Sequence, residues 1–143
     1  MAPAALVEAA RAARHNAYAP YSGFAVGAAI ATEDGQVVTG ANFENASLGL
    51  SLCAEAVALA TANAHGLLGQ ATAIAIVGDA ISASSNSIVT PCGRCRQLLV
   101  EAEHIAGRPL AIYCAPVTGQ GDDGIVTYAL ADLMPHAFGP GSL

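Results

Sequence analysis

The chain has 143 residues, of which 54% are hydrophobic, 11% are charged and 33 are alanine. With 5 arginines, no lysine and 11 acidic residues, its formal net charge is −6, which argues against binding to the phosphate backbone of nucleic acid or to an anionic membrane surface. This length fits one domain over residues 1–143, and so few charges indicate that part of the surface is buried between subunits.

The first half of the chain predicts two helices separated by a β-hairpin. Residues 4–17 are rich in alanine, which favours a helix. The Asp34-Gly35 pair is typical of a tight hairpin turn, and residues 53–65, which contain no Gly or Pro before Gly66, predict a helix that is buried on most of its faces. The elements expected here are, in chain order, a helix over 4–17, a turn over 19–23, strands over 24–32 and 37–39, a polar loop over 42–50 and a helix over 53–65.

The second half predicts strands that alternate with helices. The continuous apolar run at residues 71–77 suits an interior strand, and Thr90-Pro91 resembles a helix cap followed by proline at the first helical position. The elements expected here are, in chain order, a strand over 71–77, a loop over 80–90, a helix from Pro91 to about His104, a strand over 110–114, a turn over 119–124, a strand over 125–128 and a helical turn over 129–134. This order predicts an α/β fold with one mixed sheet between helices.

The cysteine content bears on both the compartment and the chemistry. No apolar stretch approaches the roughly 20 residues needed to cross a bilayer, and the N-terminus lacks the basic start and apolar block of a signal peptide. We therefore expect a cytoplasmic protein, in which four cysteines point to metal binding or catalysis before disulfides.

Three cysteines stand at the starts of two predicted helices. Cys92 and Cys95 are three residues apart, so both sulfurs can meet one metal ion from the same helix face. Cys53 also opens a helix, and helix N-termini favour thiolates. Thiolate ligands favour zinc, and three of them leave one tetrahedral position free, which is typical of catalytic zinc. A redox dithiol and a pair of inert buried thiols are the alternative interpretations of Cys92 and Cys95.

Glu55 follows Cys53 by two residues in a very apolar helix, where an isolated carboxylate is costly to bury. Facing the free position of a zinc ion, it would take a proton from a bound water and pass it on. A closed structural zinc module is the competing interpretation, because it requires Cys114 as a fourth ligand and gives Glu55 no task. We expect Cys114 to be a small core residue at the end of its strand instead.

The combination of Cys53-Ala54-Glu55 with Pro91-Cys92-Gly93-Arg94-Cys95 resembles the zinc signature of nucleoside and base deaminases. Further segments make the chain similar to the small oligomeric cytidine deaminase family from residue 18 to residue 140. These segments are Tyr18-Ala19-Pro20-Tyr21-Ser22, Phe24-Ala25-Val26-Gly27-Ala28, Asn42-Phe43-Glu44-Asn45-Ala46-Ser47, Cys95-Arg96-Gln97 and Leu133-Met134-Pro135-His136-Ala137-Phe138-Gly139-Pro140.

This resemblance implies a three-layer fold with a five-stranded mixed sheet between helices, usually assembled as a homotetramer. It implies that Cys53, Cys92 and Cys95 bind one Zn²⁺ per subunit and that Glu55 shuttles protons. The implied activity is hydrolytic deamination of cytidine and 2′-deoxycytidine to the uridines and ammonia, a reaction of pyrimidine salvage. The ligand would be a small nucleoside, with no nucleic acid or membrane as partner.

The resemblance also implies five substrate contacts. Asn42 and Glu44 would hold the ribose hydroxyls, and Phe24 would pack near the base and sugar. Ala54 would lie against the substrate between the zinc ligand and the proton shuttle. Phe138, like the C-terminal Phe of the family, would reach the site of a neighbouring subunit.

The chain departs from the pattern of the family at two positions. Ala56 stands where an Arg commonly follows the proton-shuttling Glu, and three thiolates around one zinc dication leave negative charge to offset. We expect Arg94 and Arg96 to offset part of it. Leu48 stands where a Tyr is usual, which indicates a wider or drier pocket. A deaminase of a modified aminopyrimidine, such as a substituted cytidine or blasticidin S, is therefore the alternative to an enzyme for cytidine itself.

Overall fold

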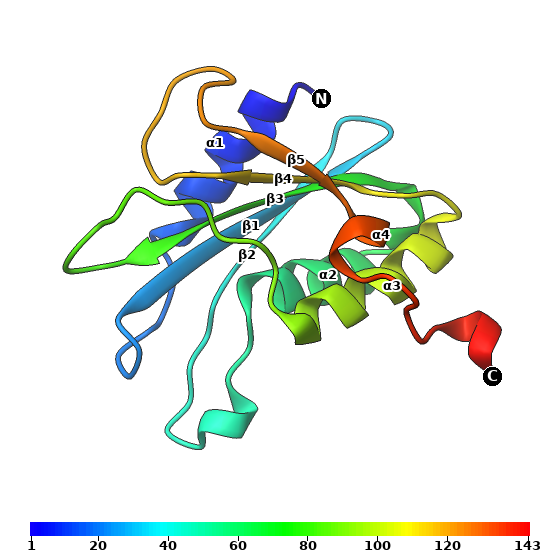
Figure 1. The fold of residues 1–143 in the computed structure, drawn as a ribbon, viewed down its shortest axis with the longest axis horizontal. Helices are drawn as coiled ribbons and strands as arrows, with labels where there is room; N and C mark the ends of the chain where they lie inside the picture. The colour runs from blue at the N-terminus through cyan, green and yellow to red at the C-terminus, as the bar shows by residue number, and fades with distance from the viewer.

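A five-stranded mixed sheet is the middle layer of the protein (Figure 1). The computed structural model describes residues 1–143, and its strands lie in the order β2-β1-β3-β4-β5. β3 and β4 are parallel, whereas the other neighbouring pairs are antiparallel. In chain order the strands are β1 (Phe24–Thr32), β2 (Val37–Ala41), β3 (Ala71–Ala80), β4 (Ala111–Ala115) and β5 (Val126–Ala129). The expected five-stranded mixed sheet is confirmed.

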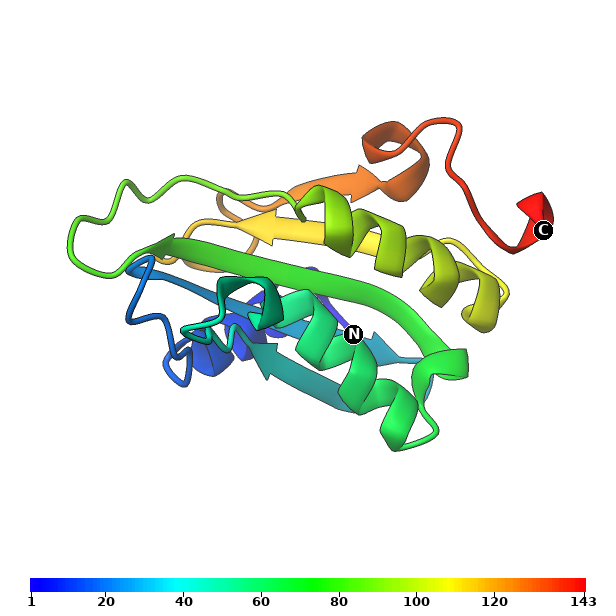
Figure 2. The ribbon, with the colours of Figure 1, turned by 90° about the horizontal axis from the view of Figure 1, so that it is seen from below.

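Helices cover both faces of the sheet, with the N-terminal helix on one face and the remaining helices on the other (Figure 2). Along β1 the side chains alternate, so that Ala28 and Ile30 pack toward α2 and α3 while Ala29 and Ala31 pack toward α1. The helices are α1 (Pro3–Arg14), α2 (Ala54–Ala64), α3 (Gly93–Ala106) and α4 (Leu130–Leu133), with short 3-10 turns at Leu48–Leu50, Leu68–Gln70 and Pro140–Ser142. The expected placement of the sheet between helices is confirmed.

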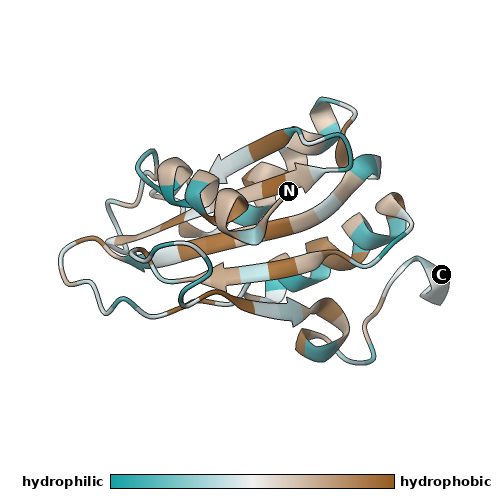
Figure 3. Cartoon of the chain, turned by 90° about the horizontal axis from the view of Figure 1, so that it is seen from above, coloured by the Kyte–Doolittle hydropathy of each residue, from teal (hydrophilic) through white to brown (hydrophobic).

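β3 lies at the centre of the sheet and is covered on both faces. Every residue from Ala73 to Asp79 is buried, and hydrophobic colours concentrate in the strands of the sheet (Figure 3). A strand covered on both faces needs apolar residues at successive positions rather than at alternate ones, which explains the continuous apolar run in the sequence. None of the helices has the length and the apolar character required to cross a membrane.

The start of α3 differs from the predicted start. The helix begins at Gly93, with Cys92 as its N-cap residue, rather than at Pro91. The predicted cap fails because the hydroxyl of Thr90 does not bond to the helix backbone; it accepts a hydrogen bond from the guanidinium of Arg96. Cys92 therefore stands at the junction where the extended chain enters the helix.

The other helix ends are also set by the backbone. α3 continues past His104 to Ala106, because Gly107 adopts a left-handed conformation with φ of 68° and terminates the helix there. α1 ends at Arg14 rather than at residue 17, since the next residues form tighter turns. These turns lead the chain to an isolated bridge between Tyr18 and Phe43.

The connection from β3 to α3 is held by the carboxylate of Asp79. Its oxygens accept hydrogen bonds from the backbone N–H groups of Ala80, Ser85 and Asn86 and from the hydroxyls of Ser84 and Ser85. These donors, the Ser84 hydroxyl above all, lower the pKa of Asp79 to about 2. The ionised carboxylate thus organises the first half of the segment that leads to Cys92.

Replacing Asp79 by Asn is expected to destabilise the protein at neutral pH, because an amide nitrogen then faces backbone N–H groups. The pKa of Asp79 is lower in the folded chain than its ordinary value of 3.8. Its contribution is therefore fully present above that value and is lost as the pH falls towards 2. Urea unfolding of both proteins across this range measures the difference. A gap in unfolding free energy that stays constant down to the lowest pH would contradict the role of Asp79.

Candidate active site

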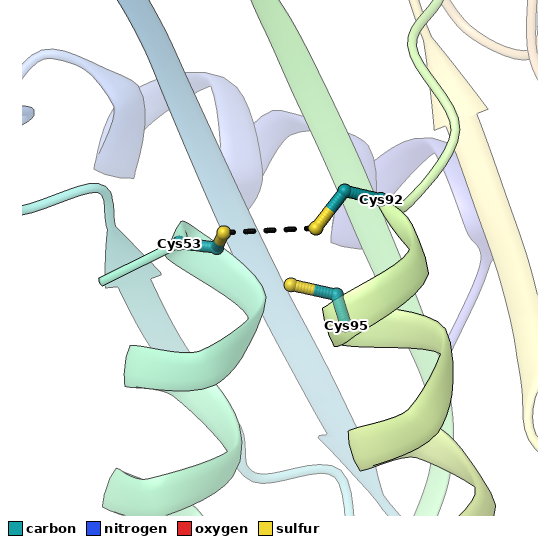
Figure 4. A group of neighbouring side chains, drawn as sticks. All are labelled: Cys53, Cys92 and Cys95. Atoms are coloured by element: carbon teal, nitrogen blue, oxygen red, sulfur yellow. Dashed lines mark hydrogen bonds between the residues drawn. The ribbon is translucent and has the colours of Figure 1, made fainter. Parts of the chain in front are cut away.

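Three cysteine sulfurs converge where the N-terminal ends of α2 and α3 lie side by side (Figure 4). Cys53 is the N-cap residue of α2, Cys92 is the N-cap residue of α3, and Cys95 lies in the first turn of α3. Their Sγ atoms all lie within 4.8 Å of one another, and those of Cys53 and Cys92 are 3.8 Å apart. None of the three forms a disulfide.

The spacing of these sulfurs fits a zinc ion. Tetrahedral zinc with Zn–S bonds of about 2.3 Å places two ligand sulfurs about 3.8 Å apart, and this matches the separation of Cys53 and Cys92. Both sulfurs lie at helix N-termini, whose positive ends stabilise thiolates. No other Cys, His, Asp or Glu joins the group, so these three residues would be the ligands of a bound zinc ion and would leave a fourth position open, as in catalytic zinc sites.

Within the cluster, the pKa values of Cys53 and Cys95 are shifted in opposite directions by the hydrogen bond between the two thiols. The pKa of Cys53 is lowered to about 6, chiefly by a hydrogen bond with Cys95 and also by Cys92 and the charge of Arg94, against the opposing effect of burial. The same hydrogen bond raises the pKa of Cys95, which keeps its proton. Binding of a cation among the sulfurs would displace the remaining thiol protons.

Glu55 lies next to the sulfurs and opens on a cavity of about 300 Å³. The residue is only 4% exposed, and burial raises the pKa of its carboxyl, with the neighbouring negative charge of Cys53 adding to the effect. A buried carboxyl that faces a cavity of small-molecule size is a typical general acid–base.

The cavity gathers most of the residues singled out in the sequence. Of these, Phe24, Asn42, Glu44, Cys53, Ala54, Glu55 and Cys92 line it, whereas Cys95 is buried and does not line it. Sequence reasoning missed Ser22, Val26, Ser51, Leu52, Ile76, Val89 and Thr90, which also line it. Ser22 and Thr90 stand close to recognisable motifs and could have been considered, but the apolar wall residues carry no local signal.

Asn42 and Glu44 are held in place by the turn and the first strand. The amide oxygen of Asn42 accepts a hydrogen bond from the N–H of Val26 at 2.9 Å, and its nitrogen donates to the carbonyl of Phe24 at 2.8 Å. Glu44 accepts a hydrogen bond from the hydroxyl of Ser22 at 2.5 Å and from two backbone N–H groups. The Ser22 hydroxyl, above all, lowers the pKa of Glu44, which keeps this carboxylate anionic.

Phe138 and Cys114 also lie outside the cavity. Phe138 is 60% exposed and does not line the cavity of its own chain; its carbonyl accepts a hydrogen bond from Gln97. Cys114 is buried in β4, outside the sulfur cluster, and burial raises the pKa of its thiol to about 12. The fourth ligand that a closed structural zinc module requires is therefore not at the cluster.

The two arginines that flank Cys95 have different surroundings. Arg94 is exposed, and its guanidinium donates one hydrogen bond, to the carbonyl of Ser51 at 3.2 Å. Its charge is one of the influences that lower the pKa of Cys53. Arg96 is half-buried and donates to three oxygen atoms.

Arg96 braces the segment that precedes Cys92. Its guanidinium donates to the carbonyl of Pro91 at 2.7 Å, to the hydroxyl of Thr90 at 3.1 Å and to the carbonyl of Leu133 at 2.9 Å. The first two partners belong to the chain that enters α3, and the third belongs to the C-terminal part of the chain. Arg96 thereby ties the entry of α3 to the end of α4.

Replacing Arg96 by Gln is expected to lower the free energy of unfolding by roughly 2–3 kcal/mol, because it removes several charge-assisted hydrogen bonds. Arg96→Lys keeps the charge but has a single donor group for three oxygens, so it is expected to restore only part of the loss. Arg94→Gln is the control and should change stability by less than about 0.5 kcal/mol. Equal unfolding midpoints in urea for Arg96→Gln and Arg94→Gln would refute the stabilising role of the Arg96 hydrogen bonds.

Comparison with known proteins identifies the family. The sequence model described as the cytidine and deoxycytidylate deaminase zinc-binding region matches residues 2–107. A cytidine deaminase from Mycobacterium tuberculosis is 43% identical over 123 residues, which cover 86% of this chain and 79% of the relative. One from Halalkalibacterium halodurans is 41% identical over 133 residues, covering 93% and 91%. The crystal structure of a cytidine deaminase from Burkholderia pseudomallei matches with a TM-score of 0.82 at 44% identity, over 96% of this chain and 100% of that one. The chain therefore belongs to the family of zinc-binding cytidine and deoxycytidylate deaminases.

Proposed function

We propose that this chain catalyses the zinc-dependent hydrolytic deamination of cytidine and 2′-deoxycytidine to the corresponding uridines and ammonia. The observation that carries the proposal is the buried carboxyl of Glu55 beside three sulfurs with the spacing of zinc ligands, in a cavity that also holds polar groups suited to a sugar. Membership of the family and identities of 41% and 43% to cytidine deaminases support it.

Cys53, Cys92 and Cys95 would hold the zinc ion. When bound, zinc lowers the pKa of a water molecule, which can then attack C4 of the cytosine ring near neutral pH. The chain fixes the three ligands on two rigid helix ends. Cys53 and Cys92 line the cavity whereas Cys95 does not, so the side of the cluster open to water and to the base is the cavity side.

Glu55 moves the protons of the reaction. The two hydrogens of the consumed water end on N3 of the uracil ring and on the departing ammonia, so protons must leave the water and reach two atoms of the base. A carboxyl next to the sulfurs can accept the first proton and donate it to N3, then accept the proton that remains on the former water oxygen and donate it to the amine nitrogen, so that two protons are accepted and two are donated. Its burial keeps these transfers apart from bulk water.

Asn42 and Glu44 bind the sugar in this proposal. The Oε2 atom of Glu44 has acceptor capacity beyond its bond with Ser22, whereas Oε1 already accepts two backbone N–H groups, and the amide of Asn42 can still donate one hydrogen. Because both side chains are already fixed by the backbone around Phe24 and Ser22, they lose little freedom when they bind ribose hydroxyls. Phe24 then supplies an apolar surface for the base and sugar.

We further propose that the chain works as a homotetramer in which Phe138 completes the site of a neighbouring subunit. Supporting this, Phe138 is exposed in its own chain, and other large apolar side chains are exposed as well: Tyr18, Tyr21, Phe43, Leu48 and Leu50. A cytoplasmic location fits four cysteines that form no disulfide. A role in pyrimidine salvage follows from the proposed reaction, which converts one pyrimidine nucleoside into another.

The charge of the three thiolates needs compensation in this chain, because Ala56 supplies none. We assign that role to Arg94 and Arg96, which flank Cys95 on the first turn of α3. Their positive charge adds to that of the helix N-termini. Because Arg96 also donates hydrogen bonds to the segment that enters α3, we assign the compensation of the thiolate charge mainly to Arg94.

Replacing Glu55 by Gln is expected to preserve the zinc content and to lower kcat by about 10³-fold or more, because the amide has the same shape but cannot accept a proton. Ammonia release and metal analysis measure the two effects. Glu101→Gln, on the exposed side of α3, is the matched control and should keep both. Substantial turnover by the Glu55 variant would rule out its role.

A panel of aminopyrimidine nucleosides tests the substrate class. We expect kcat/KM for ammonia release from cytidine and 2′-deoxycytidine to exceed that from blasticidin S by about tenfold or more, because Asn42 and Glu44 are placed for a furanose sugar. The 5-methyl derivative of cytidine reports on room around the base. A higher kcat/KM for blasticidin S than for cytidine would assign the chain to modified aminopyrimidines instead.

A further inference from the structure

Gly40 lies directly beneath the first turn of α2. It is in β2, opposite Ala28 of β1. An ideal Cβ on Gly40 would lie 2.5 Å from the carbonyl oxygen of Ala54 and 2.5 Å from the backbone nitrogen of Ala58. Both are main-chain atoms, and real Cβ atoms essentially never approach closer than 3.0 Å. The φ angle of Gly40 is not in the left-handed region, so an alanine there would lack space rather than conformational freedom.

The turn that rests on Gly40 carries two groups of the active site. Ala54 stands between Cys53, the N-cap residue of α2, and Glu55. Ala54 and Ala58 are both fully buried, so the contact with β2 belongs to the tightly packed interior. If this turn moves away from the sheet, it carries a sulfur and a carboxyl with it, while the two cysteines of α3 stay on a separate helix.

We propose that Gly40 is a positioning residue of the active site. Its missing side chain allows the first turn of α2 to approach β2 to the depth at which the sulfurs of Cys53 and Cys92 lie 3.8 Å apart. Metal–ligand distances hold to within about 0.2 Å, whereas an alanine must displace the turn by several tenths of an ångström. The inference rests on the roles given above to zinc and to Glu55.

Gly27 offers a matched control on the opposite face of the sheet. An ideal Cβ on Gly27 of β1 would lie 2.0 Å from the carbonyl oxygen of Ala10 and 2.5 Å from the backbone nitrogen of Arg14, both in α1. An alanine there also forces a helix away from the sheet. α1 carries none of the clustered cysteines. Both substitutions therefore push a helix off the sheet, but only Gly40→Ala pushes one that carries residues of the site.

The experiment compares zinc affinity, measured by competition with a chromogenic chelator, with stability and kinetics. Gly40→Ala is expected to weaken zinc binding by about 10- to 100-fold and to alter the absorption spectrum of the Co²⁺-loaded protein. It should lower kcat for cytidine by about 10- to 100-fold and change KM by less than about threefold, because the displaced groups act on the reacting atoms.

Two controls separate position from stability. Gly27→Ala is expected to lower Tm while zinc affinity stays within about twofold of the wild type. Val38→Ala, at a buried position on the same face of β2, removes volume beneath α2 without pushing it, and should behave likewise. If Gly40→Ala binds zinc as tightly as Gly27→Ala, the inference is overturned. A wild-type chain that releases no ammonia from cytidine would defeat the proposed function, while zinc affinity would still decide the role of Gly40.

Should Gly40→Ala be recovered only unfolded, Val38→Ile provides a milder push at the same interface. Its extra methylene is flexible, so the protein is expected to fold with modest overpacking. Zinc affinity should then fall by a smaller factor, about two- to fivefold. An unchanged affinity in Val38→Ile, measured beside Val38→Ala, would then overturn the inference.

Discussion

The convergence of two helix N-termini on one point is the constraint on which the rest of the structure depends. Cys53 at the start of α2 meets Cys92 and Cys95 at the start of α3, although Cys53 and Cys92 are 39 positions apart in the sequence. Sulfur anions and a buried carboxyl at Glu55 would be unfavourable in an apolar interior on their own. The positive ends of the helices lower the cost of this negative charge, and a cation held by Cys53, Cys92 and Cys95 would lower it further.

Small residues allow the helices to bring these groups close to the sheet. Ala54, Ala58 and Ala62 of α2 lie in the core, and Gly40 of β2 lies where the backbone of α2 comes close to the sheet. Side chains of this size bury less apolar area per residue than leucine or phenylalanine, but they permit main-chain atoms to touch across the layers. The high alanine content of the chain is thus connected to the precision of the site as well as to its core.

The irregular segments around the cavity owe their shape to a few charged side chains rather than to apolar packing. Asp79 collects the donors of the connection after β3, Arg96 ties the entry of α3 to the C-terminal part of the chain, and Glu44 accepts the donors of the turn before β1. In each case one ionised group satisfies several backbone or hydroxyl groups that loops leave without partners. A chain with few charges thus uses several of them where regular secondary structure ends.

Local patterns in the sequence were sufficient to predict the mixed sheet between helices, the hairpin before β2 and the zinc-binding trio, because each depends on residue types at short spacing. The resemblance to the deaminase family added the cavity contacts of residues such as Phe24 and Glu44. Other features depend on contacts between distant segments: the apolar cavity wall, the loss of Thr90 as a helix cap to a bond from Arg96, and the close approach of α2 to Gly40. Residue spacing within one segment carries no information about the distances between main-chain atoms of different layers. These features are therefore decided by the tertiary structure.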